Sequence, residues 1–316
     1  MSSTKTYVVG LSVCMSLLTA CAQGEAGSNE TNQDSTKTMT DGVGNEVTIP
    51  EEPERIVAPY LEDPLVTIGE EPVRQWAVQN GSSHQQYLEE FLGDTEFIDY
   101  ELPLEALMEA EPDLVIVPDV SSLGSGEYEQ YSQIAPTYVL GTEASEDWRT
   151  ALTEIGTILD REDAAEEALN EYDSYVEEVK EQLGEHVGSD KVAAIWVTNG
   201  SYYIVAPDVA SGAVLFEDLG LHPANAIANL PDEVEAHWNE LSLEALAELD
   251  ADYLFLISSD EGSADDLTTE SVWSNIPAVE KDQVIEISED SSWLYNGYQA
   301  NRQTIEEVYT ELIEKE

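Results

Sequence analysis

The middle of the chain has the hydrophobic pattern of helices. Between residues 144 and 183, apolar side chains recur every three or four positions, and the segment contains no Pro and a single Gly. This spacing predicts two helices with a break near 160–163, the second covering about 160–183. At about 1.5 Å per residue the second helix is long enough to cross from one lobe to another. Trp148 lies on the apolar stripe, which predicts that it packs in the core.

A repeated unit flanks this helical segment. Residues 101–113 (ELPLEALMEAEPD) and 240–252 (ELSLEALAELDAD) agree at eight of thirteen positions without gaps. Each copy is followed by an unbroken apolar run, at 114–117 and at 253–257. A short helix followed by a buried strand is an α/β unit, and unbroken apolar strands suit a sheet that is covered on both faces. The repeat therefore predicts an α/β protein with two similar lobes.

The same patterns predict the division of the chain. We expect an N-terminal lobe over 41–143, connecting helices over 144–189 and a C-terminal lobe over 190–316. The predicted strands lie near 55–58, 73–78, 114–117, 137–140, 191–197, 202–205, 253–257 and 283–287, and the last helix lies near 300–314.

The first forty residues differ in composition from the rest. Residues 7–20 are mostly apolar but are too few to span a bilayer, which needs about 20 residues. They end in Leu-Thr-Ala-Cys, which resembles the bacterial lipoprotein signal, so we expect a signal peptide over 1–20 and a lipid-carrying Cys21. An ordinary signal cleaved near Ala20 or Ala22 is the alternative. Residues 21–40 are predominantly polar and predict a flexible tether.

Charge excludes whole classes of partner. The 316 residues include 67 Asp and Glu against 11 Lys and Arg, for a net charge of -56. Such a chain lacks the positive face that nucleic-acid phosphates or anionic lipid headgroups require. The acids are spread along the sequence, which fits a solvated surface at high salt, an alkaline habitat or a compositional bias of the lineage.

Motifs of enzymes and metal sites are missing from the sequence. It contains no G-x-S-x-G, G-x-G-x-x-G, Walker A, H-E-x-x-H or C-x-x-C motif. The four His include no i, i+4 pair, and His237 with Glu240 forms an H-x-x-E that is weak by itself. We therefore expect neither an enzyme nor a resident metal or cofactor.

Several segments between residues 41 and 316 resemble, in their order along the chain, the substrate-binding lipoproteins of bacterial ABC importers for ferric siderophores, haem and cobalamin. The resemblance covers about 41–316 and depends on the order and spacing of its segments. These are 43–50 (VGNEVTIP), 53–58 (PERIVA), 62–73, 112–116 (PDLVI), 217–221 (EDLGL), 273–279 and 293–298.

The resemblance implies a fold and a set of partners. The family fold has two Rossmann-like lobes joined by one long rigid helix, with the ligand in the cleft between them. It implies a monomer on the extracytoplasmic face of the cell membrane, held by lipid on Cys21, that delivers a ferric siderophore to ABC permease subunits. In the family, a glutamate on each lobe docks onto permease arginines, which here implies Glu105 and Glu244. Iron would enter only as part of the bound chelate.

Aromatic residues near strand ends and in loops are candidates for the ligand cleft, because ring faces and hydroxyls suit a bulky chelate. Arg74 is the one cation that we place in the cleft, and 206–216 lack the Arg that hydroxamate binders of the family often carry. With so few cations we expect a neutral or cationic ferric chelate of hydroxamate type, whose oxygens Arg74 meets. The alternatives are haem or cobalamin binding, and a surface lipoprotein or enzyme without a transport role. The candidate ligand-binding residues are Tyr60, Arg74, Trp76, Trp196, Tyr202, Tyr203, Trp238, Trp293 and Tyr295.

Overall fold

The computed structural model describes residues 35–79, 81–124, 126–230, 237–259, 267–269 and 271–315. Residues 35–316 form one compact unit. The predicted signal peptide, Cys21 and most of the predicted tether lie outside the described residues. The end of that tether is not a free linker, because β1 (Thr36–Thr40) pairs antiparallel with β2 (Glu46–Pro50). Met39 of β1 also packs against the core, and Lys37 forms an ion pair with Asp160.

The N-terminal half contains two further three-stranded sheets, in the orders β3-β7-β8 and β5-β4-β6. The pairs β3–β7, β7–β8 and β4–β6 are parallel, and a parallel bridge between Val57 and Arg74 links the two sheets. The elements are β3 (Ile56–Val57), α1 (Glu62–Thr67), β4 (Gln75–Val78), β5 (Ser83–His84), η1 (Gln86–Leu88), α2 (Glu89–Leu92), β6 (Phe97–Asp99), α3 (Leu104–Ala110), β7 (Leu114–Val117), η2 (Val120–Leu123), α4 (Tyr128–Ser132), β8 (Thr137–Val139) and α5 (Thr142–Glu146).

Two helices, α6 (Trp148–Ile158) and α7 (Glu162–His186), connect the halves. The break between them includes Asp160, whose φ of 53° is left-handed. The predicted end near 183 is wrong by three residues, because Gly184 continues the helix. The chain leaves the helical path at Gly188, whose φ of 60° suits the position after a helix end.

The C-terminal half is built on a six-stranded sheet of order β12-β10-β9-β13-β14, with β11 pairing β9. The strand β13, which lies between β9 and β14, is buried on both faces: Phe255 and Ile257 enter one core cluster, and Leu254 and Leu256 enter the other. The elements are β9 (Lys191–Thr198), β10 (Ser201–Val205), α8 (Ala210–Gly212), η3 (Ala213–Asp218), β11 (His222–Pro223), α9 (Asn225–Ala228), β12 (Trp238–Leu241), α10 (Leu243–Ala247), β13 (Tyr253–Ser258), α12 (Pro277–Glu280), β14 (Val284–Ile287), η4 (Ser292–Leu294), α13 (Tyr298–Tyr309) and η5 (Thr310–Glu314).

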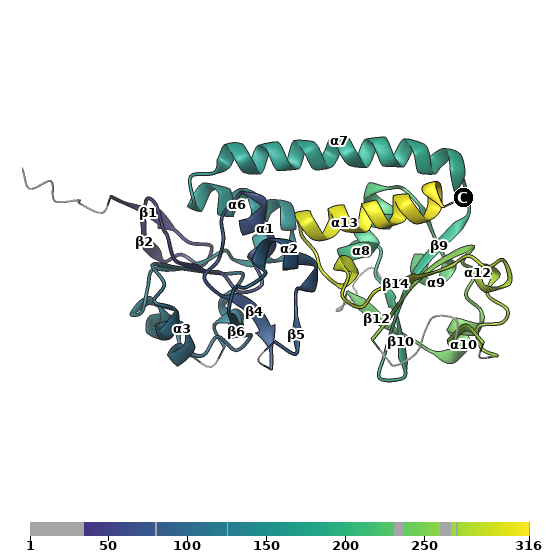
Figure 1. The fold of residues 1–316 in the computed structure, drawn as a ribbon, viewed down its shortest axis with the longest axis horizontal. Coiled ribbons are helices and arrows are strands. Elements are labelled where there is room, and N and C mark those ends of the chain that lie inside the picture. Colours follow the sequence, from purple (N-terminus) through teal and green to yellow (C-terminus); the bar gives the residue numbers. More distant parts are fainter. Residues whose placement is uncertain are drawn as a thin grey trace, which may run out of the picture. The chain divides into compact units, whose positions relative to one another are not determined.

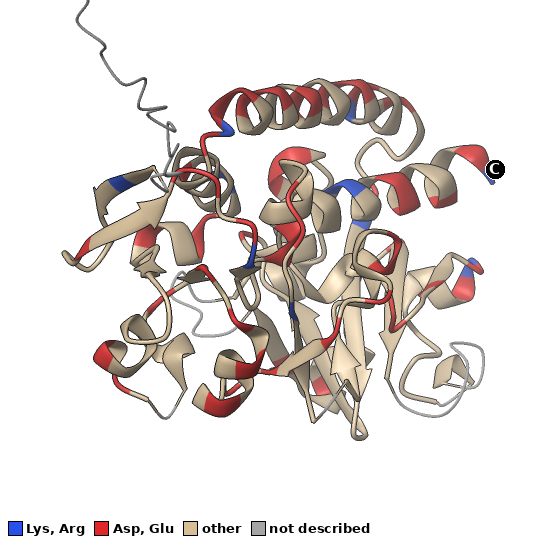
Figure 2. Ribbon diagram, turned by 60° about the vertical axis from the view of Figure 1, so that its left-hand side comes forward, with Lys and Arg blue, Asp and Glu red and all other residues tan. Residues whose placement is uncertain are grey.

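The long helices α7 and α13 pack against each other and run side by side in Figure 1. The predicted α/β class is confirmed. Acidic positions recur along these helices and across the loops, whereas basic positions are few (Figure 2). Among the described residues, no helix is both long enough and apolar enough to span a bilayer.

Candidate functional site

A cavity of about 500 Å³ is bounded by segments from both halves of the chain. Tyr60, Leu61 and Pro64 contribute from the start of α1, and Pro118 follows β7. The end of α5 and the start of α6 form another wall. The C-terminal half contributes Asp208, Val209, His237 and the segment 294–298, apart from Tyr295. Because it draws on segments from both halves, the cavity has the placement of a ligand cleft.

The lining of this cavity is aromatic and acidic. Tyr60, Trp148 and Tyr298 supply ring faces, and Glu146 and Asp208 supply exposed carboxylates. No Lys or Arg lines it within the described part of the chain. Such a site offers stacking surfaces and a negative potential, which suits a bulky ligand without excess negative charge.

Two buried carboxyl groups lie in the first turn of α1, between the lining residues Leu61 and Pro64. Glu62 accepts a hydrogen bond from the backbone N–H of Trp76 at 2.5 Å, and its Oε2 has no partner among the described residues. Burial raises the pKa of Glu62 to about 8, the charge of Asp63 adds to this, and hydrogen bonds oppose it. Burial also raises the pKa of Asp63, against the lowering effect of hydrogen bonds from Gln299, Ala300 and Tyr87.

Three of the predicted ligand-binding residues form an aromatic cluster at one edge of the cavity. The ring of Tyr60 lies edge-on to Trp76 with centroids 5.1 Å apart, and its centroid is 6.5 Å from that of Tyr295. Tyr60 is 49% exposed, and its φ of 66° is left-handed. The hydroxyl of Tyr295 donates to the carbonyl of His84 at 3.1 Å, and burial, with the nearby Tyr60, raises the pKa of Tyr295 to about 12.

A second predicted group gathers on the sheet of the C-terminal half. Trp196 contacts Tyr203 and Trp238, with ring centroids 5.6 and 6.0 Å away. The indole Nε1 of Trp196 donates to Ser259 at 2.9 Å. Trp238 directly follows His237, which lines the cavity. None of the three lines the cavity itself, so their binding roles stay predictions.

The structure places three other predicted residues away from the cavity. Trp293 is fully buried against Phe255 and donates to Glu307, so it is a core residue. Tyr202 packs edge-on against Trp273, on the strand face opposite to Tyr203. The Arg74 guanidinium forms an ion pair with Glu96 at 2.9 Å and donates to the carbonyl of Val73.

Sequence reasoning missed most of the lining residues. Trp148 is half-buried and packs against the core, as predicted, with its ring centroid 5.0 Å from that of Tyr172, but it also lines the cavity, which was not predicted. Tyr298 lies in a segment noted for family resemblance, which was the available signal. Glu146 and Asp208 carried no signal that would distinguish them from the many surface acids, and His237 was noted only for the weak H-x-x-E pattern that it forms with Glu240.

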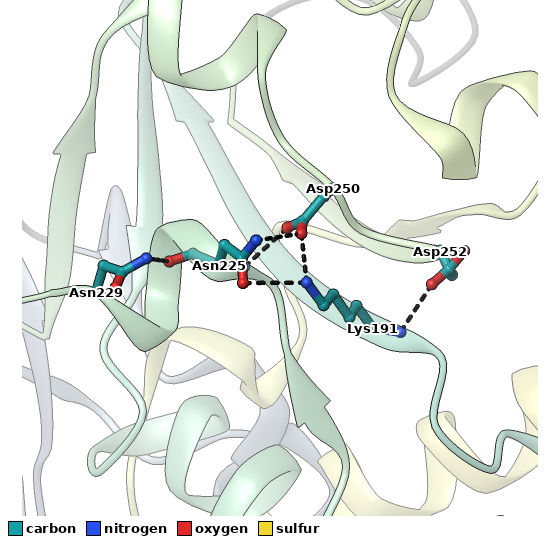
Figure 3. Close-up of polar contacts among 5 residues, drawn as sticks. All are labelled: Lys191, Asn225, Asn229, Asp250 and Asp252. Carbon is teal, nitrogen blue, oxygen red and sulfur yellow. Dashed lines mark hydrogen bonds and ion pairs between the residues drawn. The ribbon is translucent and has the colours of Figure 1, made fainter.

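All the described Lys and Arg side chains have partners. A cluster at the start of β9 is an example: Lys191 forms an ion pair with Asp250, and its Nζ also donates to Asn225 (Figure 3). The backbone N–H of Lys191 donates to Asp252. The other cations bind carboxylates, carbonyls or a hydroxyl: Lys37, Arg55, Arg74, Arg149, Arg161, Lys180, Lys281, Arg302 and Lys315. Each described cation is therefore already in contact with another group of the protein.

Glu105 and Glu244 occupy matching places on the repeated unit. Each is the second residue of its helix, α3 or α10, and each side chain is exposed. Neither forms an ion pair with another described residue. Nor do the described residues include a group of three or more His, Cys, Asp or Glu that could hold a metal ion.

The comparisons with known proteins agree with this arrangement. Residues 98–291 match the family model described as "Periplasmic binding protein". The chain is 26% identical over 295 residues to a Bacillus subtilis protein named "Probable siderophore-binding lipoprotein YfiY", with 89% of each chain covered. It is 22% identical to the iron(3+)-hydroxamate-binding protein YxeB of the same species, covering 98% of this chain and 96% of YxeB. The fold matches Staphylococcus aureus SirA complexed with staphyloferrin B, with TM-score 0.70, 23% identity, and 88% and 98% of the two chains covered.

Proposed function

Because the chain belongs to the periplasmic binding protein family, we propose that it captures a ferric siderophore outside the cytoplasm and delivers it to the permease of an ABC importer. The names of its relatives support siderophore and iron-hydroxamate ligands. The family consists of binding proteins, which agrees with the missing enzyme motifs. Iron would arrive with its coordination already filled by the chelate, so the protein needs no metal ligands of its own.

The ligand class that the cavity favours is a neutral or cationic ferric hydroxamate. The single observation that carries this proposal is the lining itself: aromatic rings with Glu146 and Asp208, and no Lys or Arg among its described residues. A strongly anionic catecholate would bring uncompensated negative charge beside two carboxylates, which is unfavourable. The proposal does not depend on Arg74, whose guanidinium is occupied by Glu96.

Titration of tryptophan fluorescence tests the ligand class. The probes are ferric desferrioxamine B, which is a cationic trihydroxamate, ferric enterobactin, haem and cobalamin. We expect ferric desferrioxamine B to bind most tightly and to remain bound in molar salt, because contacts with the aromatic lining, which salt does not screen, supply most of its affinity. Tighter binding of ferric enterobactin in the same buffer would exclude the proposed class.

Haem is the second candidate ligand. It usually requires an axial His, Tyr or Met, and His237, Tyr60 and Tyr298 all line the cavity. A haem absorption spectrum that His237→Ala changes, with no response to ferric desferrioxamine B, would favour this alternative.

Attachment to the membrane is proposed through lipid on Cys21. The lipoprotein name of one relative and the Leu-Thr-Ala-Cys segment support it. We expect Cys21→Ser to release the protein from the membrane fraction of cells. Retention of that variant on the membrane would contradict the proposed anchor. We also propose that Glu105 and Glu244 dock onto the permease subunits.

A further inference from the structure

Asp63 joins two helices that lie far apart in the sequence. It is 2% exposed in the first turn of α1, and its carboxylate accepts hydrogen bonds from the backbone N–H groups of Gln299 at 3.1 Å and Ala300 at 3.0 Å. These are the second and third residues of α13, whose amides have no partner within the helix. Asp63 thus caps α13 from another segment, and its charge lies where the helix dipole favours an anion.

The residue before α13 leaves room for this carboxylate. Gly297 has an extended backbone with φ of 164°, a conformation that any residue adopts. A Cβ at Gly297 would lie 2.5 Å from Cγ of Asp63, which is too close for two carbon atoms. The glycine is therefore explained by the close approach of Asp63, which occupies the place of a local capping side chain.

Other hydrogen bonds hold the same end of α13 to the N-terminal half. Gln299 donates to the hydroxyl of Thr67 at 3.2 Å, and Gln303 donates to the carbonyl of Tyr87 at 3.1 Å. The hydroxyl of Tyr87 in turn donates to Asp63 at 3.1 Å. Asp63 is the one charged side chain in this set, and its hydrogen bonds are therefore expected to be the strongest.

The residues of this contact are close in the chain to residues on two walls of the cavity. Leu61, which precedes α1, and Pro64, which follows Asp63, line one wall, and Gly297 and Tyr298 line the other. The carboxylate of Asp63 does not line the cavity, but its hydrogen bonds join two segments that do.

We propose that Asp63 is a positioning residue that fixes the two walls of the cavity in the geometry that binds the ligand. This inference rests on the proposed capture of a ferric chelate. It adds to the residues that affect binding one that contacts α13 and does not contact the ligand. The feature that distinguishes Asp63 from an ordinary helix cap is that it joins separate segments.

Asp147 provides a matched control. It caps α6 by accepting hydrogen bonds from the N–H groups of Arg149 at 3.4 Å and Thr150 at 2.9 Å, so its contacts are local. Its neighbours Glu146 and Trp148 also line the cavity. Both Asp63→Ala and Asp147→Ala remove a helix cap beside the cavity, but only the first removes a connection between the two halves.

The experiment compares the dissociation constant for ferric desferrioxamine B at a temperature where both variants are folded. We expect both to lower the melting temperature, Asp63→Ala to weaken binding at least tenfold and Asp147→Ala to change it less than twofold. Asp63→Asn, which keeps the shape and one acceptor oxygen, replaces Asp63→Ala if that variant does not fold. Equal affinity of the two variants would overturn the proposal and leave the proposed function intact.

Amide hydrogen exchange gives a readout that needs no ligand. Loss of Asp63 should accelerate exchange in both 60–66 and 294–300, whereas loss of Asp147 should affect α6 alone. If the wild type binds no ferric chelate, the proposed function fails, and unchanged exchange in these two segments would separately overturn the positioning role.

Discussion

The backbone N–H of Trp76 donates a hydrogen bond to the carboxyl group of Glu62, whose side chain is completely buried. This contact ties the first turn of α1 to β4 beneath the aromatic cluster of Tyr60. A carboxyl group in this place is costly to ionise, and burial raises its pKa to about 8. Glu62 is therefore protonated in the folded protein at pH values where it is ionised in the unfolded chain.

The first prediction concerns pH. Between about pH 4.5, where Glu62 ionises in the unfolded chain, and about pH 8, the folded state holds one more proton, so stability falls as the pH rises. Glu62→Gln cannot ionise and should remove this part of the dependence, making it more stable than the wild type by about 1–3 kcal/mol at pH 9. Urea unfolding from pH 5 to pH 9 measures both. Glu90→Gln, at an exposed position, is the control, and its free energy of unfolding should depend on pH as that of the wild type does. If the free energy of unfolding of Glu62→Gln also changed with pH in parallel with the wild type, the raised pKa of Glu62 would be contradicted.

The second prediction concerns the close approach of Gly297 and Asp63. Gly297→Ala adds a methyl group 2.5 Å from the carboxyl carbon, so we expect it to lower the free energy of unfolding by about 1–3 kcal/mol. In an Asp63→Ala background the same substitution should cost much less, because the space is then free. A double-mutant cycle by urea unfolding measures this coupling. Additive effects would show that the two residues do not compete for the space.

The third prediction concerns the attachment of α7 to the C-terminal half. The hydroxyl of Tyr172 donates to Asp218 of η3 at 2.6 Å, and both groups are partly shielded from water. Tyr172→Phe leaves this carboxylate without that donor and should reduce the free energy of unfolding by about 1–3 kcal/mol. Tyr309→Phe, which loses a bond to the neutral amide of Gln182, should cost less. If Tyr172→Phe and Tyr309→Phe lowered the free energy of unfolding equally, the charge of the acceptor Asp218 would make no special contribution.

The elements that the sequence predicts best depend on local periodicity. The apolar runs at 114–117 and 253–257 form β7 and β13, because unbroken apolar residues suit strands with both faces covered. The helical stripe between 144 and 183 likewise appears as α6 and α7. Such patterns record burial along a single element, which is information that the local sequence contains.

The cavity depends on how separate elements meet, which local periodicity does not record. Trp148 shares the apolar stripe of α6 with Leu152 and Ile155, yet Trp148 and Leu152 line the cavity and Ile155 does not. Tyr202 and Tyr203 are adjacent in β10 and must face opposite sides, but the sequence does not state which side the core covers. Trp293 was expected in the cleft but is buried in the core. The local sequence did not record that this residue packs against a different element.

The last prediction concerns Glu105 and Glu244, which we propose bind arginines of the permease. Both are exposed in the first turn of equivalent helices, where a pair of carboxylates can orient the protein on a two-fold partner. Replacing both with Ala should reduce iron uptake by cells at least tenfold while the affinity for the ferric chelate stays within twofold. Glu109 and Glu248 provide the matched control, since they are exposed, lie four residues later in each copy of the repeat and have the same charge. Their double substitution removes the same amount of charge and should leave uptake nearly unchanged. Equal losses from both double variants would indicate a general effect of charge, and weaker ligand binding with normal permease association would exclude the docking role.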